Sequence, residues 1–202
     1  TSIRMNFLEE AYEAVDAIDL DDPELLCEEL GDVLMQVGFH TQIEQEAGRF
    51  TWQQVCDGVC RKLIDRHPHI FGGDTSIKDW DALKNKEKGR TTLADELNTV
   101  PATLPALMYA QKMQKRAARR GAWEPDPETA NAALEEALRG WQISTPETAA
   151  ERAGQLLFAA ADALRLAGVD AEEALTFSSR RFREELLRGP ETSAEQEPPV
   201  SD

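Results

Sequence analysis

Five carboxylates stand at helical spacing in two short stretches near the start of the sequence. Glu9, Glu10 and Glu13 belong to the first stretch, and Glu29 and Asp32 belong to the second. Side chains three or four positions apart on a helix are neighbours, and like charges so placed repel by roughly 0.2–0.5 kcal/mol per pair unless a cation compensates. Oxygen ligands without Cys or His among them suit Mg²⁺ or Mn²⁺. The spacing therefore indicates a divalent-cation site, and the alternative is a solvated acidic helix face.

Each acidic stretch also carries apolar residues at intervals of three and four, which predicts a helix with one apolar face. The apolar positions are Phe7, Leu8, Ala11, Tyr12, Val15 and Ile18 in the first stretch and Leu25, Leu26, Leu30, Val33, Leu34 and Val37 in the second. We expect this face to lie in a core, with the acids beside it. Between the stretches, Asp22 is the expected N-cap and Pro23 the first helical residue. Two antiparallel helices joined there would bring four oxygen ligands together.

Three segments of the sequence together resemble a known family. They are residues 7–18 with the pattern EExxE, residues 28–37 with the pattern ExxD, and residues 66–71, which read RHPHIF. In this combination the sequence resembles the MazG family of nucleoside triphosphate pyrophosphohydrolases, within the all-α NTP pyrophosphatase superfamily, from about Ser2 to Phe182. The resemblance implies hydrolysis of a nucleoside triphosphate to a nucleoside monophosphate and pyrophosphate, which serves nucleotide-pool housekeeping.

The resemblance also implies a role for each acid. The family's Mg²⁺ ligands correspond to Glu10, Glu13, Glu29 and Asp32, with Mn²⁺ as an alternative ion, and Glu9 adjoins them. We expect all five to be catalytic, with Glu9 orienting or activating the attacking water. A triphosphate carries several negative charges, which a carboxylate pocket repels unless divalent cations bridge the two.

Basic and aromatic residues further along the chain are candidates for substrate binding. By the same resemblance, the phosphate and base contacts of the family correspond to Lys62, Arg66, Trp80 and Lys84. Each pair is four residues apart and so shares one helical face. The alternatives stay open: Lys62 and Arg66 as a solvated helix edge, and Trp80 as a core aromatic.

The second half of the sequence is interpreted as a weakened copy of the first. The segment 101–105 resembles the family's hinge between two MazG units, so we place a MazG-like catalytic unit at 1–95 and a degenerate MazG-like helical unit at 96–188. Residues 189–202 have no periodic apolar positions and are expected to form a disordered acidic tail.

The second unit lacks acids that a metal site needs. Glu135 and Glu136 keep the start of the first acidic motif, but Arg139 stands at its third acidic position. In the second motif, Arg152 and Gln155 stand in place of both acids. Such a pocket cannot hold a cluster of divalent cations. We expect a structural or dimer-forming role, and the alternative is that the two arginines bind an anion such as a regulatory nucleotide.

Composition excludes several classes of protein. A net charge of −16 argues against general nucleic-acid binding, and no apolar run reaches the roughly 18 residues of a membrane span. Three cysteines without a framework spacing are typical of a reduced, cytoplasmic protein. We therefore expect an all-α protein of tandem MazG-like helical units. Homodimerisation would complete the bundle, because short helical units need a partner to complete a core.

Two further expectations concern the start of the chain and its activity. The resemblance implies a Cys-Pro-Trp-Asp segment and more helix ahead of the acidic motif, so the sequence is interpreted as N-terminally truncated or as lacking that cover. The rival function is a non-hydrolysing, nucleotide-binding regulatory helical dimer, against which the complete acidic set of residues 9–32 argues in the first unit. A third interpretation, a purely structural helical dimer, predicts no stabilisation by Mg²⁺.

Overall fold

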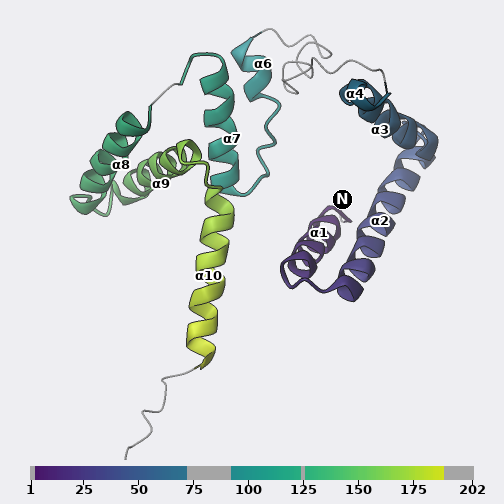
Figure 1. The fold of residues 1–202 in the computed structure, drawn as a ribbon, viewed down its shortest axis with the longest axis horizontal. Coiled ribbons are helices and arrows are strands. Elements are labelled where there is room, and N and C mark those ends of the chain that lie inside the picture. The colour runs from purple at the N-terminus through teal and green to yellow at the C-terminus, as the bar shows by residue number, and fades with distance from the viewer. Residues whose placement is uncertain (1–2, 72–91, 124–125, 189–202) are drawn as a thin grey trace, which may run out of the picture. The chain divides into compact units, whose positions relative to one another are not determined.

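The computed structural model describes residues 3–71, 92–123 and 126–188, which form helices joined by turns and loops, without a strand (Figure 1). The all-α fold expected from the sequence is confirmed. By its internal contacts the chain divides into two compact units, Thr1–Leu83 and Lys84–Asp202, and each unit is considered by itself. None of the helices in these described ranges is both long and apolar enough to cross a membrane.

A helical hairpin opens the first unit. Helix α1 (Ile3–Asp19) is joined to α2 (Pro23–Glu46) by a short turn, as the sequence predicts. Asp22 is the N-cap of α2, and its Oδ1 atom accepts hydrogen bonds from the backbone N–H groups of Glu24 at 3.1 Å and Leu25 at 3.0 Å. Because the cap satisfies two donors that the helix leaves open, it fixes the residue at which α2 begins.

The two helices of the hairpin lie antiparallel, and small and polar side chains make their contact. Phe7 near the start of α1 meets His40 near the end of α2, with the two ring centroids 5.7 Å apart. The buried side chains of the hairpin are Ala14, Ala17, Gln36 and Thr41. Ala14 and Ala17 follow Glu10 by four and seven positions, so they share its side of the helix. The side of α1 that carries Glu10 therefore faces α2.

Part of the apolar stripe that the sequence predicted for the core lies on the exposed side of this hairpin, so the prediction was wrong within the unit for those positions. They are Leu8, Tyr12, Val15, Ile18, Leu30 and Leu34, while the rest of the stripe is half-buried. Tyr12 is 57% exposed, Ile18 59% and Leu34 60%. The reason is geometric, because the two alanines let α1 and α2 approach through their small side chains. The bulky apolar side chains are left on the outer side of the pair, where the described part of the unit does not cover them.

Helix α3 (Trp52–Arg66) packs against α2, and the short helix α4 (Pro68–Phe71) follows it. Thr51 and Gln54 form a capping box at the start of α3. The Thr51 Oγ1 atom accepts a hydrogen bond from the Gln54 backbone N–H at 3.3 Å, and the Gln54 Oε1 atom accepts one from the Thr51 backbone N–H at 2.8 Å. The box sets where α3 begins and hence the register of the basic residues on it.

The described part of the second unit is a set of packed helices. Its described helices are α6 (Leu93–Leu97), α7 (Ala106–Arg119), α8 (Pro127–Gln142), α9 (Ala149–Leu166) and α10 (Ala171–Arg188). Helix α9 packs against both α7 and α8, while α6 and α10 contact α7 (Figure 1). The interpretation of residues 1–95 and 96–188 as repeated units stays a prediction, and residues 189–202 lie outside the described part of the chain.

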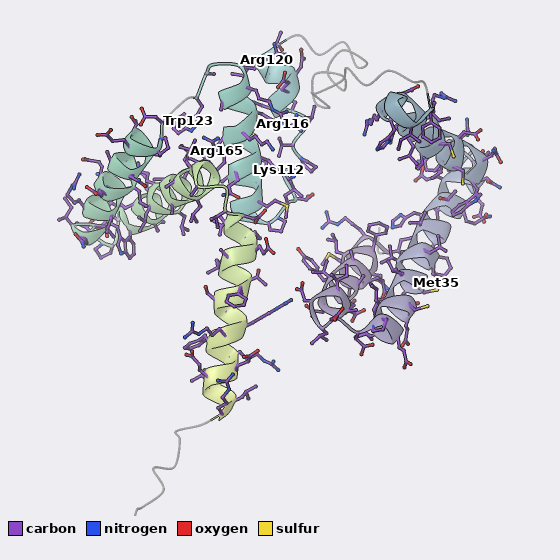
Figure 2. The ribbon with its side chains drawn as sticks, viewed as in Figure 1. Met35, Lys112, Arg116, Arg120, Trp123 and Arg165 are labelled. Carbon is purple, nitrogen blue, oxygen red and sulfur yellow. The ribbon has the colours of Figure 1, made fainter. Side chains whose placement is uncertain are left out.

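A basic run follows one side of α7. Lys112, Arg116 and Arg120 come at intervals of four residues and lie one above the other along the helix (Figure 2). The Arg120 Nε atom donates a hydrogen bond to Oε1 of Glu96 at 2.6 Å, which ties α6 to the end of α7. Gly121 follows with a φ of 65°, a left-handed conformation that favours glycine and ends the helix.

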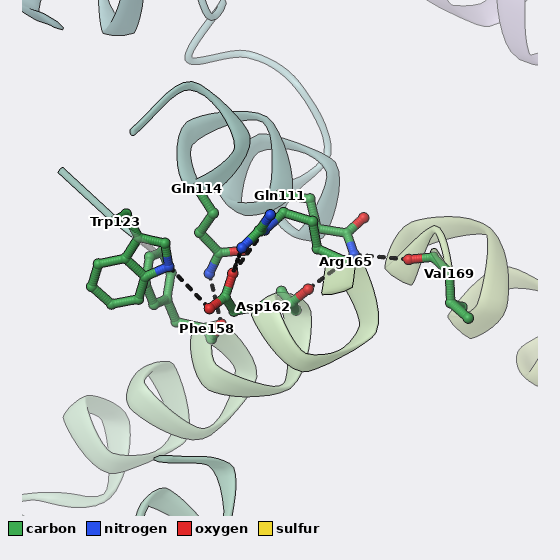
Figure 3. A network of polar contacts seen from close by, with 8 residues as sticks. Gln111, Gln114, Trp123, Phe158, Asp162, Arg165 and Val169 are labelled. Carbon is green, nitrogen blue, oxygen red and sulfur yellow. Dashed lines mark hydrogen bonds and ion pairs between the residues drawn. The ribbon is translucent and has the colours of Figure 1, made fainter. Parts of the chain in front are cut away.

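Two glutamines of α7 bind backbone carbonyl groups of the neighbouring helix region. The Gln111 Nε2 atom donates hydrogen bonds to the carbonyl oxygens of Ala161 and Val169, both at 3.0 Å (Figure 3). The Gln114 Nε2 atom donates one to the carbonyl oxygen of Phe158 at 2.9 Å. These directional contacts fix the register between α7 and α9, because each amide reaches one particular turn of the partner.

A buried carboxylate sits between α9 and the end of α7. Asp162 is 3% exposed; its Oδ2 atom accepts a hydrogen bond from Nε1 of Trp123 at 3.0 Å, and its Oδ1 atom accepts one from Nε of Arg165 at 2.8 Å (Figure 3). The Trp123 ring meets the Phe158 ring edge-on, with centroids 6.0 Å apart. The two donors compensate for the burial of the charge.

Candidate metal centre

Three acids from the two helices of the hairpin come together in the first unit. Glu10 and Glu13 on α1 and Glu29 on α2 each offer one carboxylate oxygen, and these three atoms lie within 4.8 Å of one another. Glu10 and Glu29 are half-buried in the helix contact, and Glu13 is exposed. In the part of the chain that the structure describes, no other three His, Cys, Asp or Glu side chains meet in this way. Hard oxygen atoms at this spacing fit Mg²⁺ or Mn²⁺.

The other two predicted acids lie beside this triad. Asp32 is half-buried and follows Glu29 by three positions on α2, so it shares the same side of the helix. Glu9 is exposed on α1, next to Glu10 in the chain. The structure thus brings three of the four predicted metal ligands together and places the fourth one helical turn away.

The crowding of the acids contributes to raised pKa values at Glu13 and Glu29. Partial burial raises the pKa of Glu13, and the charge of Glu29 and a hydrogen bond with Glu10 raise it further. Partial burial also raises the pKa of Glu29, followed by the charges of Asp32, Glu28 and Glu10. Each shift means that the folded chain disfavours the charged carboxylates. The positive charge of a cation bound among these carboxylates would stabilise their ionised forms.

Sequence reasoning missed one residue of this centre. Gln36 is buried on α2, and its Nε2 atom donates a hydrogen bond to Oε1 of Glu10 at 3.4 Å. A signal for it existed, because Gln36 follows Glu29 by seven positions and Asp32 by four, and these intervals place all three on one side of α2. The ligands predicted from the sequence were acids alone, so this neutral oxygen in the same row was not among them.

The predicted substrate-binding residues are placed in part. Lys62 is exposed and Arg66 half-buried, and both lie on α3, four residues apart and hence on one side of the helix. The Arg66 Nε atom is buried without a hydrogen-bond partner among the described residues. Neither side chain forms an ion pair with the acidic triad in that part of the chain. Trp80 and Lys84 lie outside the described residues.

In the second unit, the positions interpreted as weakened copies of the acidic motifs lie on α8 and α9, and side chains there pair with neighbours on their own helix. Nη1 of Arg139 lies 3.7 Å from a carboxylate oxygen of Glu135, and its Nη2 lies 3.3 Å from one of Glu136. The Arg152 Nη1 atom donates a hydrogen bond to Oε1 of Gln155 at 3.1 Å. Arg139 thus pairs with both remaining acids of the motif, and a divalent cation has no triad to bind among the described residues of this unit.

The chain is similar to one known protein family and to several of its named members. Residues 1–71 match the family described as the MazG nucleotide pyrophosphohydrolase domain. The chain is 37% identical over 190 residues to the nucleoside triphosphate pyrophosphohydrolase/pyrophosphatase MazG of Thermotoga maritima, which covers 93% of this chain and 74% of that protein. It is 37% identical over 193 residues to the nucleoside triphosphate pyrophosphohydrolase of Escherichia coli K12, covering 88% and 73% of the two chains. A mycobacterial protein of the same name, from Mycobacterium tuberculosis, is 41% identical over 127 residues, which cover 59% of this chain and 38% of the relative.

Proposed function

This chain belongs to the MazG family of nucleotide pyrophosphohydrolases, and we propose that its first unit carries out the reaction in which a nucleoside triphosphate is hydrolysed to a nucleoside monophosphate and pyrophosphate. The observation that carries the assignment to the first unit is the meeting of Glu10, Glu13 and Glu29. A triphosphate is polyanionic, so an acidic pocket can accept it only through cations. The triad has the ligand chemistry for them.

We assign Mg²⁺, or Mn²⁺ in its place, to Glu10, Glu13, Glu29 and Asp32. A divalent cation held there supplies positive charge to the phosphates and lowers the pKa of the attacking water. Asp32 is the fourth oxygen donor because it shares the side of α2 that carries Glu29. Glu9 is exposed at the edge of the triad, where its carboxylate can orient the attacking water or accept its proton.

We assign substrate contacts to the basic residues that follow. Helix α3 packs against the helix that carries Glu29, and the guanidinium of Arg66 has a buried donor without a partner among the described residues. Phosphate oxygens suit such a donor, since arginine binds them in charge-assisted hydrogen bonds. Lys62 on the same side of α3 adds a second positive charge. The roles of Trp80 at the base and Lys84 at a phosphate rest on the family resemblance.

The second unit is assigned a structural role. Glu135 and Glu136 are paired with Arg139, and Arg152 contacts Gln155 at the positions of the second motif. Two positive side chains at the positions of metal ligands would repel a divalent cation. The first unit therefore works as the catalytic unit of this chain.

A homodimer and a cytoplasmic location complete the proposal. The outer side of the first unit's hairpin exposes large apolar side chains such as Tyr12, Ile18 and Leu34. A second copy that covers this side would bury the surface that the helix contact leaves open. The three cysteines of the chain are free thiols in the structure, in keeping with a reducing compartment.

The test is release of pyrophosphate and nucleoside monophosphate from each common NTP and dNTP, with Mg²⁺ and with EDTA. The variants are Glu10→Gln/Glu13→Gln in the first unit and Glu135→Gln/Glu136→Gln in the second, so each removes two carboxylate charges from the acidic motif of one unit. We expect equimolar products that need Mg²⁺, that disappear in the first variant and that persist in the second.

Two results would overturn the assignment. Loss of product release in the Glu135→Gln/Glu136→Gln variant alone would move the reaction to the second unit. Nucleotide binding without any release of pyrophosphate would favour the non-hydrolysing regulatory dimer.

A further inference from the structure

Gln36 lies in the contact between α1 and α2 and is 4% exposed. Its Nε2 atom donates a hydrogen bond to Oε1 of Glu10 at 3.4 Å. This orientation of the amide follows from chemistry, because an ionised carboxylate can only accept. The Gln36 Oε1 atom is buried and has no hydrogen-bond partner among the residues that the structure describes. The Nε2 atom of Gln36 therefore has a hydrogen-bond partner within the described residues, and the Oε1 atom has none.

An amide with an unpaired oxygen is an unfavourable choice for a helix contact. Removing the oxygen from water costs free energy that no hydrogen bond returns. A methionine has a similar length and would fill the same space without that cost. The buried Gln36 oxygen therefore costs free energy unless a group outside the described residues pairs with it.

The position of this oxygen within the metal centre suggests a bound cation as that group. Glu29, Asp32 and Gln36 follow one another at intervals of three and four, so Gln36 extends the row of oxygen donors on α2 by one turn. Cation sites combine carboxylates with neutral amide or carbonyl oxygens. A neutral donor adds an oxygen contact without adding a negative charge to acids that already repel one another.

We propose that Gln36 is a positioning residue of the cation site, whose Nε2 holds the Glu10 carboxylate and whose Oε1 offers a neutral oxygen to the hydrated divalent cation. The proposal rests on the proposed function, because it requires that the acidic triad binds a cation. In this role both the Nε2 and the Oε1 atom of Gln36 have a partner. The role also explains why a polar side chain stands in the row of acids on α2.

The second unit offers a matched comparison. Gln114 is 2% exposed, its Nε2 atom donates to the carbonyl oxygen of Phe158 at 2.9 Å, and its Oε1 atom is likewise buried without a partner among the described residues. No acidic triad exists in the described residues of that unit. Gln114 is thus an amide with the same burial and the same unpaired oxygen, but without a metal centre beside it.

The experiment is a titration of the full chain with Mn²⁺ in the absence of nucleotide, in which electron paramagnetic resonance measures the bound Mn²⁺. The proteins are the wild type, Gln36→Met, Gln114→Met and Glu10→Gln. We expect Gln36→Met to weaken Mn²⁺ binding by about 10- to 100-fold, the usual effect of losing a residue that orients a metal ligand. Gln114→Met should leave the Mn²⁺ affinity unchanged. The Mg²⁺ concentration for half-maximal hydrolysis should rise in Gln36→Met by the same factor as the loss of Mn²⁺ affinity.

Two failures are distinguishable. If Gln36→Met binds Mn²⁺ as tightly as the wild type while Glu10→Gln does not bind it, the role of Gln36 is wrong and the proposed function stands. If the wild type does not bind Mn²⁺, or Glu10→Gln leaves binding unchanged, the proposed site fails and this inference fails with it. Should Gln36→Met not fold, Gln36→Asn keeps the amide on a side chain one methylene shorter, and the same loss of affinity is expected.

Discussion

The Glu172 carboxylate caps α7 from a different helix, since its Oε2 atom accepts a hydrogen bond from the backbone N–H of Leu107 at 3.1 Å. The same oxygen also accepts one from the backbone N–H of Met108 at 3.3 Å. Pro105, the N-cap residue of α7, makes no side-chain hydrogen bond to the helix. A residue 65 positions away in the chain therefore supplies the acceptor that a local cap would otherwise provide.

Replacing this acceptor is expected to destabilise the second unit. We expect Glu172→Ala to lower the free energy of unfolding by about 0.5–2 kcal/mol, the usual cost of removing a helix cap. Urea denaturation followed by circular dichroism measures it. Glu173→Ala removes the neighbouring, exposed carboxylate and serves as the control. Equal losses in the two variants would show that net charge, not capping, is responsible.

The buried carboxylate of Asp162 makes Arg165 indispensable to the second unit. We expect Arg165→Met to cost about 3–5 kcal/mol of unfolding free energy, because a buried carboxylate loses its cationic partner. The Trp123 indole donates to the same carboxylate but carries no charge, so it does not replace the cation. Circular dichroism during urea denaturation measures the loss. The double variant Asp162→Leu/Arg165→Met should recover part of the loss. A double variant as unstable as the sum of the two single ones would contradict this account.

The raised pKa values of Glu13 and Glu29 predict how Mg²⁺ stabilisation depends on pH. Between the ordinary value of 4.5 and the raised values, the folded chain without cations binds more protons than the unfolded chain. The stability contributed by these two groups is therefore lost as the pH rises through their raised pKa values. Mg²⁺ favours the charged forms, so the increase in melting temperature that it causes should be larger at about pH 8 than at about pH 5.5.

Thermal melting with and without Mg²⁺ across this pH range is the measurement. The control is Glu13→Gln/Glu29→Gln, which has no titrating group at either position and should show little response to Mg²⁺ at any pH. A wild-type response that is independent of pH would contradict the coupling between these carboxyls and the cation.

The exposed apolar side of the first unit predicts the oligomeric state. If a second copy covers this side, Ile18→Glu/Leu34→Glu places charges within the contact and should convert the dimer to a monomer. Sedimentation velocity at several concentrations detects the change. Ile143→Glu puts a charge on an exposed apolar position of the second unit, 81% exposed, and is the control. A dimer that survives the double substitution would assign the interface to another surface.

Local features of the fold could be predicted from the sequence. The helices follow from apolar periodicity, and the start of α2 follows from Asp22 and Pro23, because each depends on a few consecutive residues. The acids of the metal centre were also predictable, since their spacing lies within two helices. Each of these signals comes from residues that lie close together in the sequence.

Other features depend on which sides of two helices meet. For these the prediction from the sequence was wrong or could not be made. The bulky stripe with Tyr12 and Ile18 was predicted to be buried, but Ala14 and Ala17 lie in the contact instead. A hydrophobic pattern shows that a face seeks cover, but not whether the same chain or another one covers it. The spacing of Gln36 from Glu29 and Asp32 was legible in the sequence, but its hydrogen bond to Glu10 was seen only in the contact across the hairpin.

The alanines of the hairpin have a consequence for the metal centre itself. Ala17 is fully buried and Ala14 nearly so, and the distance between two packed helices depends on the size of the side chains at their contact. That distance sets the span between Glu10 and Glu13 on one helix and Glu29 on the other. A small ion such as Mg²⁺ and a larger one such as Ca²⁺ require different spans between their oxygen donors. In the proposed site, discrimination between ions by radius would thus depend on two methyl groups that carry no ligand atom.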